Sequence, residues 1–211
     1  LHFKTIQEAM AQGSGKVALR GWVYRERGSN KLRFIVLRDE TGIIQCVIKK
    51  DAVGEEQFEL ADKLQVEASL RLSGEIKKDE RAPSGYEVVV DAFDVVGWSD
   101  TYPITKDQSA EFLLDKRHLA IRGRKQSALL KIRSAYVQAR EEFFIKEGFT
   151  RFDAPILQPS QCEGGSTLFE VKYYKEKTYL SQSWQLYAEA GIFPLGKIYN
   201  FGPTFRAEKS K

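Results

Sequence analysis

Two side chains in the first half of the sequence have the types needed to read an unpaired nucleic-acid base. Phe34 offers a flat ring for stacking, and Gln45 offers an amide that can hydrogen-bond the edge of a base. If residues 39–42 form a hairpin turn, Val36 lies opposite Gln45, and Phe34 and Gln45 then share one face of the hairpin. The sequence therefore predicts a base-reading surface, unless another element covers Phe34.

The residues around this hairpin divide between a core and a basic rim. The other face of the hairpin is apolar and suits the inside of a small barrel; it carries Ile35, Leu37, Ile44, Cys46 and Ile48. Basic side chains that could meet phosphates cluster beside the base-reading face, namely Arg25, Arg27, Lys31 and Arg33. A basic cluster or a net charge of +4 is compatible with a nucleic-acid partner but does not establish one, so the hypothesis depends on the aromatic neighbour.

The elements that position these residues change in character near residue 100. Before it, short β-branched runs separated by turn residues predict strands, with a helix around residues 55–64 after the third strand. The predicted strands cover residues 17–24, 32–38, 43–48, 66–76 and 86–96. Five strands with a helix after the third are the plan of an OB-fold. We place this all-β domain at residues 1–98 and a linker at residues 99–108.

A helical period replaces the strand pattern in residues 109–211. Apolar residues at intervals of three and four, from Leu129 to Phe143, predict one long amphipathic helix closed by Gly148. Further segments follow it, with strands at 150–154, 168–174 and 178–180, a helix at 185–193 and a final strand at 198–206. The whole chain is therefore predicted to be α+β, with an all-β N-terminal domain.

Motifs in both halves resemble the aspartyl-, asparaginyl- and lysyl-tRNA synthetases, a subclass of the class II aminoacyl-tRNA synthetases. In the first half, the resemblance to their anticodon-binding barrel lies in RGWVYR at 20–25, FIVLRD at 34–39 and GIIQ at 42–45. In the second half, GFT at 148–150 with Pro155 resembles the first class II motif, and FRAE at 205–208, standing after QSWQLY at 182–187, resembles the second. The resemblance implies that residues 109–211 are the N-terminal part of a class II catalytic domain with an antiparallel sheet.

The same resemblance assigns roles to residues of the barrel. It implies that the barrel binds a tRNA anticodon with a central uridine. Phe34 would stack on this uridine and Gln45 would hydrogen-bond its edge, while Arg25 would contact the RNA backbone.

The amino-acid substrate can be argued from two neighbouring positions. Aspartyl enzymes place a Lys three residues after the position that matches Gln185, and here that residue is Ala188, followed by Glu189. A fixed carboxylate would repel aspartate but could accept a hydrogen bond from the amide of asparagine. The runs QLYAEA at 185–190 and 201–211 resemble asparaginyl enzymes best, so the resemblance and the charge argument together imply an asparaginyl enzyme. Glu189 could instead be an ordinary exposed helix residue. An aspartyl enzyme of relaxed specificity is the alternative for the chain, although Ala188 and Glu189 disfavour it.

The implied reaction is attack of the amino-acid carboxylate on the α-phosphate of ATP. Because the carboxylate is already ionised, alignment and charge stabilisation lower the barrier without a general base. Arg206 would be the catalytic group, gripping a phosphate oxygen and the substrate carboxylate, and Glu208 would lie near the adenine of ATP. Glu163 would close over the amino acid from a glycine-containing loop, and Ser183 and Gln185 would orient its ammonium, although Ser183 could instead cap the following helix.

Bulk features indicate the setting of the protein. No stretch approaches the ~20 apolar residues of a membrane helix, and the first residues lack the layout of a signal peptide. Cys46 and Cys162 cannot form a disulfide framework, and no Cys/His spacing suggests zinc. We expect a cytoplasmic homodimer, paired through the first motif, that binds tRNA, asparagine and ATP and no membrane.

The sequence stops at Lys211, shortly after the second motif. The third motif of the family, and the acidic residues that usually hold its Mg²⁺, are not among these residues, so the metal ligands are unknown. We expect the 211 residues alone to be inactive as an adenylating enzyme. The alternative is a non-catalytic fragment that binds tRNA or forms dimers.

Overall fold

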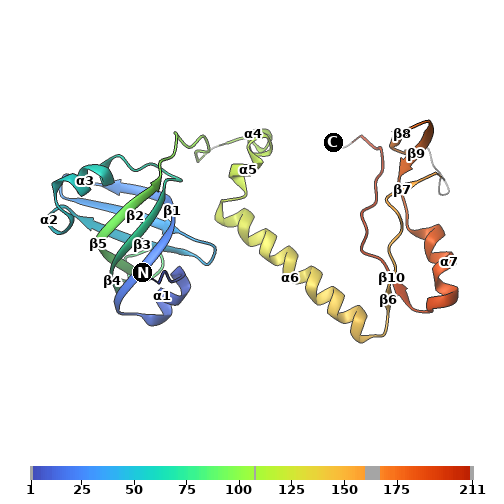
Figure 1. Cartoon of the computed structure of the whole chain (residues 1–211), viewed down its shortest axis with the longest axis horizontal. Coiled ribbons are helices and arrows are strands. Elements are labelled where there is room, and N and C mark those ends of the chain that lie inside the picture. The colour runs from blue at the N-terminus through green and yellow to red at the C-terminus, as the bar shows by residue number, and fades with distance from the viewer. Residues whose placement is uncertain (1, 107, 160–166, 210–211) are drawn as a thin grey trace. The chain divides into compact units, whose positions relative to one another are not determined.

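The computed structural model describes residues 2–106, 108–159 and 167–209. The chain divides into two compact units, Leu1–Lys116 and Arg117–Lys211 (Figure 1). The division follows the short helix α4 (Ala110–Asp115) and so falls later than the linker predicted at residues 99–108. The domain bounds 1–98 and 109–211 stay a prediction.

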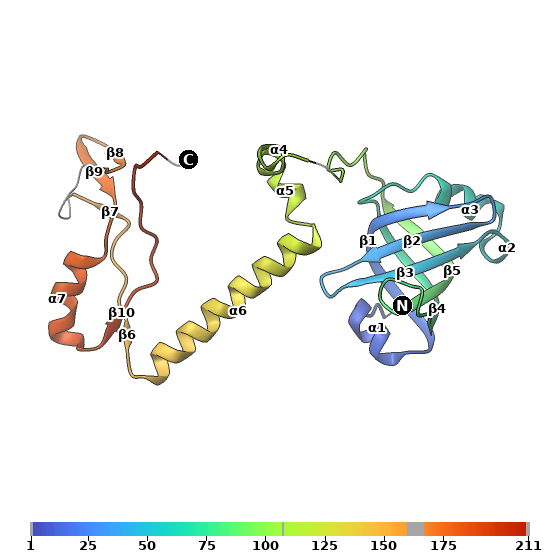
Figure 2. The ribbon, with the colours of Figure 1, turned by 180° about the vertical axis from the view of Figure 1, so that it is seen from behind.

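The first unit is a closed five-stranded barrel, which confirms the predicted OB-fold. Its strands follow the order β1-β2-β3-β5-β4 around the barrel, and β3 and β5 pair in parallel where the other neighbours are antiparallel (Figure 2). The strands are β1 (Gly15–Gly28), β2 (Leu32–Arg38), β3 (Ile43–Lys49), β4 (Ser69–Lys78) and β5 (Tyr86–Gly97). Apolar side chains of all five strands form one buried cluster inside the barrel.

Helices fill the ends of the barrel. The predicted helix between the third and fourth strands is present as α3 (Glu55–Asp62), preceded by the single turn α2 (Lys50–Val53). The sequence pattern missed α1 (Ile6–Gln12), which adds Ile6 and Ala9 to the barrel core. A capping box starts α1, with Thr5 and Glu8 exchanging side-chain to backbone hydrogen bonds, and the Thr-x-x-Glu spacing that encodes it is visible in the sequence.

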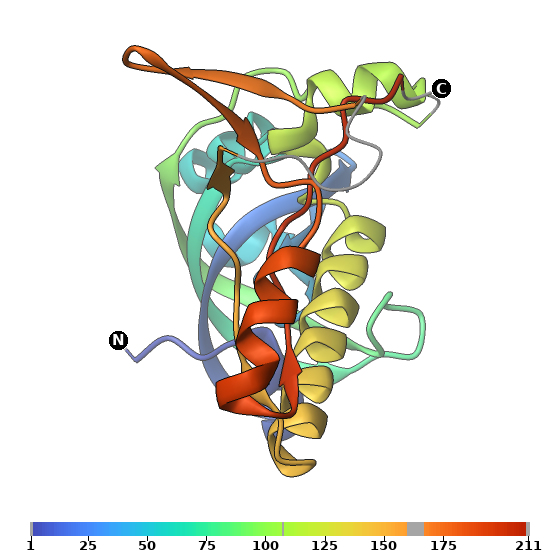
Figure 3. The ribbon, with the colours of Figure 1, turned by 90° about the vertical axis from the view of Figure 1, so that its right-hand side faces the viewer.

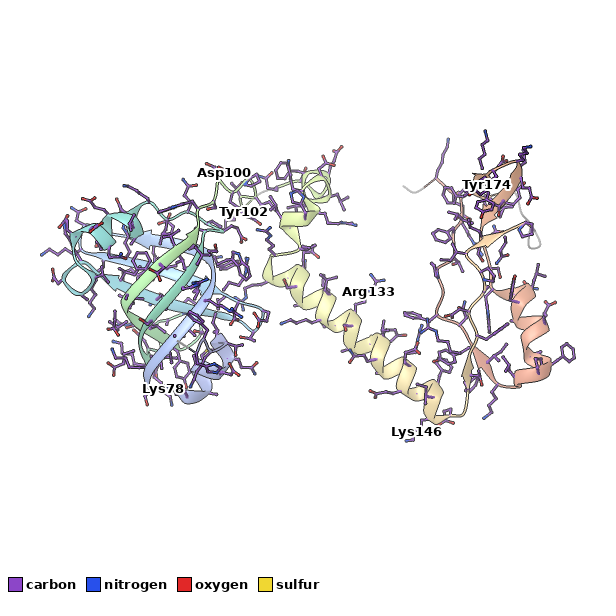
Figure 4. The ribbon with its side chains drawn as sticks, viewed as in Figure 1. Lys78, Asp100, Tyr102, Arg133, Lys146 and Tyr174 are labelled. Atoms are coloured by element: carbon purple, nitrogen blue, oxygen red, sulfur yellow. The ribbon has the colours of Figure 1, made fainter. Side chains whose placement is uncertain are left out.

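The second unit contains the predicted long helix and a set of short strands. Its elements are α5 (Arg117–Ala120), α6 (Arg124–Lys146), β6 (Thr150–Arg151), β7 (Leu157–Gln158), β8 (Glu170–Tyr173), β9 (Glu176–Leu180), α7 (Gln185–Leu195) and β10 (Ile198–Tyr199). β6 and β10 pair in parallel, and β7, β9 and β8 form an antiparallel sheet whose β8–β9 hairpin extends away from α7 (Figure 3). Tyr174, at the tip of that hairpin, points into solvent (Figure 4).

Helix α6 ends as the sequence predicts. Gly148 adopts a left-handed backbone with φ of 76° just beyond the C-cap, a conformation that glycine reaches without a steric cost. The apolar stripe that predicted the helix lies on its surface: Leu129, Ile132, Tyr136 and Phe143 are all exposed. The stripe therefore marks a face of α6 that the other described residues of the second unit leave uncovered.

The prediction of a final strand at residues 198–206 was wrong beyond Tyr199. Residues 200–209 form no ladder in the part of the chain that the structure describes, but make isolated backbone bonds from Phe205 N to Ser181 O (2.8 Å) and from Ala207 N to Thr167 O (2.7 Å). Pro203 has no N–H to donate to a ladder. The predicted strand at 150–154 is likewise reduced to Thr150–Arg151.

Candidate functional site

The hairpin of β2 and β3 has the register that the sequence predicts. Val36 pairs with Gln45 and Ile35 with Cys46, so Phe34 and Gln45 lie on the outer face of the barrel. The five apolar residues of the opposite face are all buried: Ile35, Leu37, Ile44, Cys46 and Ile48. Burial raises the pKa of the Cys46 thiol to about 12, as expected for a core residue without a chemical role.

A β-bulge brings two arginines to the same outer face. Val23 pairs with Leu37 and points into the core, and the register of β1 against β2 shifts between Val23 and Arg25. Without this shift Arg25 would point inward like Val23, because side chains alternate along a strand. After it, Arg25 pairs with Val36 and Arg27 lies opposite Phe34.

The candidate base reader Gln45 is surrounded by polar neighbours rather than open to solvent. The residue is only 5% exposed. Its Nε2 donates to Oε2 of Glu87 at 3.1 Å, and its Oε1 accepts from Nη2 of Arg27 at 3.5 Å. The Arg27 guanidinium lies 5.2 Å from the ring centre of Phe34, which is half-buried. The outer face is thus a connected cluster of Arg27, Phe34, Gln45 and Glu87, which we call the reading cluster.

Sequence reasoning missed Glu87 as a member of this cluster. Glu87 lies on β5 and meets Gln45 through the parallel β3–β5 pairing. That contact depends on closure of the barrel between β3 and β5, which α2, α3 and β4 separate in sequence. No local pattern could have revealed it.

The remaining basic residues of the rim differ from one another. Arg25 is exposed, and its guanidinium lies 5.5 Å from the ring centre of Tyr24. Arg33, in contrast, forms an ion pair with Asp62 of α3. Arg25 is therefore available to a phosphate, whereas Arg33 already has an acidic partner, and a backbone contact by Arg25 stays a prediction.

Helix α7 and the residues just before it carry three side chains expected to bind the amino acid: Ser183, Gln185 and Glu189. Trp184 is its N-cap, and the Ser183 hydroxyl accepts a hydrogen bond from the backbone N–H of Gln185 at 3.1 Å. Ser183 therefore serves the first turn of the helix without being its N-cap. Gln185 Nε2 donates to Oε1 of Glu189 at 3.1 Å, one helical turn further on. These two side chains are exposed and form one polar pair.

The residues predicted to bind ATP lie on the irregular segment after β10. Backbone bonds of Phe205 and Ala207 fix the segment on either side of Arg206. The Arg206 and Glu208 side chains are exposed, and Nη1 of Arg206 lies 3.9 Å from Oε1 of Glu208. A guanidinium with such a distant, exposed partner can exchange it for a phosphate at little cost.

Contacts with α6 anchor the start of this segment. The Tyr199 hydroxyl donates to Oε2 of Glu141 at 2.6 Å, and the Tyr199 ring stacks on Phe144 with ring centres 4.6 Å apart. The Arg140 guanidinium lies 3.5 Å from the ring centre of Phe201. The hydrogen bond from Tyr199, with the nearby charges of Arg140 and Arg151, lowers the pKa of Glu141.

Two further expectations concern Glu163 and a metal. Glu163 lies outside the described residues. Among the residues that the structure describes, no group of three or more His, Cys, Asp or Glu could hold a metal ion. These residues therefore identify no set of protein ligands for Mg²⁺, and we derive no step through the metal.

Comparison with known proteins decides the family. Residues 109–211 match the family described as tRNA synthetases class II (D, K and N). Residues 17–96 match the family described as OB-fold nucleic acid binding domain. Residues 109–211 therefore belong to the class II tRNA synthetases.

Named relatives of this class II chain carry one activity in their names. This chain is 49% identical over 198 residues to an asparagine–tRNA ligase of Chloroflexus aurantiacus, and the match covers 93% of this chain and 45% of the relative. It is 47% identical over 197 residues to an asparagine–tRNA ligase of Pelotomaculum thermopropionicum, covering 93% of this chain and 46% of the relative. The chain thus spans about half the length of the curated relatives it matches.

Solved structures agree with this class II fold. The crystal structure of asparaginyl-tRNA synthetase from Pyrococcus horikoshii complexed with asparaginyl-adenylate matches with a TM-score of 0.92 at 44% identity, covering 100% of this chain and 49% of that one. A putative aspartyl-tRNA synthetase from Leishmania major Friedlin matches with a TM-score of 0.85 at 20% identity, which supports the fold alone. In the described part of this chain, no helix is long and apolar enough to cross a membrane.

Proposed function

We propose that this chain is part of an enzyme that attaches asparagine to tRNA, using ATP and an asparaginyl-adenylate intermediate. Its barrel would bind the anticodon, and residues 109–211 would supply the second class II motif of the catalytic domain. The Gln185–Glu189 pair on α7 carries the proposal. It presents a carboxylate close to the position where aspartyl enzymes present a Lys, and relatives at 47–49% identity are named asparagine–tRNA ligases.

Selection of the amino acid follows from the charge of Glu189. Its Oε1 accepts from Gln185, which leaves lone pairs of the carboxylate for the side-chain amide of asparagine. Aspartate would place a second carboxylate against it, and Ala188 stands where aspartyl enzymes carry a Lys. Ser183 and Gln185 would orient the substrate ammonium, with Glu163 closing the site.

Adenylation would use positioned charge rather than acid–base chemistry. The ionised carboxylate of asparagine attacks the α-phosphate of ATP, its oxygen forms the new bond to phosphorus, and pyrophosphate leaves. Arg206 would hold a phosphate oxygen and the substrate carboxylate in one fork, and Glu208 would lie at the adenine. When bound, Mg²⁺ would neutralise charge on the phosphates, with ligands that the described residues do not identify.

Recognition of tRNA would use the reading cluster of the barrel. Phe34 would stack on a central anticodon uridine, Gln45 would hydrogen-bond its edge, and Arg25 would contact the backbone.

We further propose a homodimer in which the exposed apolar stripe of α6 is covered by a second copy, since such a stripe is costly in water. A cytoplasmic location rests on the cysteine content.

The proposal is tested by measuring the exchange of labelled pyrophosphate into ATP on the complete protein, once with asparagine and once with aspartate. Exchange that requires asparagine supports it, and exchange with aspartate alone identifies an aspartyl enzyme instead. RNA binding without exchange for either amino acid would leave a binding module. Arg206→Lys keeps the charge but not the fork, and should lower asparagine-dependent exchange by roughly 100-fold or more if Arg206 stabilises the transition state.

A further inference from the structure

The amide of Gln45 is held at its two ends by groups of opposite hydrogen-bonding character. Its Nε2 donates to the carboxylate of Glu87, and its Oε1 accepts from the guanidinium of Arg27. A carboxylate can only accept and a guanidinium can only donate. One orientation of the amide satisfies both neighbours, and the reversed orientation satisfies neither, so the chemistry of the neighbours fixes which end is the oxygen.

Burial and strand pairing make this arrangement firm. Glu87 is 6% exposed and also lies 3.0 Å from Nζ of Lys77, which fixes its other oxygen. The pairing of Gln45 with Glu87 and of Glu87 with Lys77 places the three side chains side by side across β3, β5 and β4. Reversing the amide here would set N–H against guanidinium and oxygen against carboxylate, at a site with little water to compensate.

We propose that Glu87 and Arg27 are specificity-determining positioning residues, which lock the Gln45 amide in the orientation that reads uracil and rejects cytosine. The inference rests on the proposed function, in which Gln45 reads the central anticodon base. Uracil presents a carbonyl acceptor beside a ring N–H donor. Cytosine presents an amino donor and a ring nitrogen acceptor at the same two positions. In one pose, the two bases require opposite orientations of the same amide.

The locked amide keeps what uracil needs. The bonds to Glu87 and Arg27 use one N–H of Nε2 and one lone pair of Oε1, so one donor and one acceptor of the amide remain for a base. Stacking on Phe34 cannot supply this discrimination, because every base has a face that stacks. The choice between the two pyrimidines therefore falls to the orientation of the Gln45 side chain.

The proposed role of Glu87 and Arg27 is tested by measuring the binding of two RNA anticodon stem-loops. The two RNAs are identical except for U or C at the central anticodon position. At fixed salt, the 211-residue chain should prefer the U stem-loop by at least about fivefold, as expected for one paired donor–acceptor contact. In Glu87→Gln, residue 87 can donate as well as accept, so only the longer contact with Arg27 still opposes reversal of the Gln45 amide. The preference should then fall through a gain in affinity for the C stem-loop, with affinity for U nearly kept, and it should fall toward unity when Arg27→Gln is added.

Two further variants separate positioning from other roles. Glu75→Gln removes the same charge from an exposed site on neighbouring β4, and should keep the preference. Arg27→Gln removes the guanidinium that donates to Oε1 of Gln45, and it should also reduce the preference for U. Because Arg27 is exposed, this variant should fold even if Glu87→Gln does not.

Three results would overturn the inference. An unchanged preference in both folded variants would show that the amide is not locked by these neighbours. An equal loss of affinity for both RNAs would make Glu87 a direct RNA contact or a residue of the fold. Binding of neither RNA by the unmodified chain would remove the proposed anticodon function itself, and the lock with it.

Discussion

Replacement of Phe34 by alanine asks whether this ring serves RNA or the fold. The ring is half-buried and stands outside the buried core cluster, with the Arg27 guanidinium 5.2 Å from its centre. Loss of one stacked base should weaken RNA binding by about 1–3 kcal/mol, which is about 5- to 150-fold in Kd. Because the ring is not in the core, unfolding should become easier by clearly less than the ~3–5 kcal/mol typical of a buried Phe→Ala change.

The assay pairs two measurements on each variant. Fluorescence anisotropy gives the Kd for an anticodon stem-loop at one fixed salt concentration, because phosphate contacts make the Kd depend strongly on salt. Urea unfolding gives the stability. Phe93→Ala is the matched control, since that ring is 4% exposed inside the barrel and its loss should cost the full core penalty. If Phe34→Ala costs as much stability as Phe93→Ala, or leaves the Kd unchanged, the stacking role is refuted.

Three other substitutions test separate parts of the argument. Ala188→Lys should weaken asparagine activation in the complete protein by placing a cation suited to aspartate, and unchanged exchange kinetics would undermine the selection argument. Gly74→Ala should lower barrel stability by about 1–3 kcal/mol in urea unfolding, because the new Cβ would overlap the Val89 carbonyl; equal stability would contradict this. The hydrogen bond from Tyr199 lowers the pKa of Glu141, so this bond stabilises the fold above the ordinary glutamate pKa. The stabilisation is lost as the pH falls through the lowered pKa. The thermal midpoint of Tyr199→Phe should therefore fall less between pH 6 and about pH 3.5 than that of the unmodified chain.

The register of the barrel hairpin could be predicted from sequence because two independent constraints agree. A short turn fixes which residues face each other, and a one-residue slip would bring Ile35 and Cys46 to the outer face. The long helix could be predicted for a similar reason, since its apolar spacing and the terminating Gly148 indicate the same element.

The surroundings of the reading residues could not be predicted, because they depend on pairings distant in sequence. Gln45 is on the outer face as predicted, but its burial arises from Glu87 on a strand that joins β3 only when the barrel closes. The segment that carries Arg206 illustrates the opposite problem. Its composition is typical of a strand, but a strand also needs a neighbouring strand to pair with along its length. Among the described residues, residues 200–209 form only isolated backbone hydrogen bonds.

The two units differ in how much apolar surface they bury, and this difference has a testable consequence. The barrel has a buried cluster drawn from all five strands, α1 and α3, whereas Tyr199 alone represents the second unit among the buried apolar residues that the structure describes. A unit that buries little cannot offset the entropy cost of ordering its chain as well as the barrel does. Backbone amides of β1–β5 should therefore exchange with deuterium far more slowly than those of α6 and α7 in this chain. Protection of α6 and α7 that equals that of the barrel would mean that another surface, such as a second copy on the α6 stripe, completes their core, and dilution should then remove that protection while leaving the barrel unchanged.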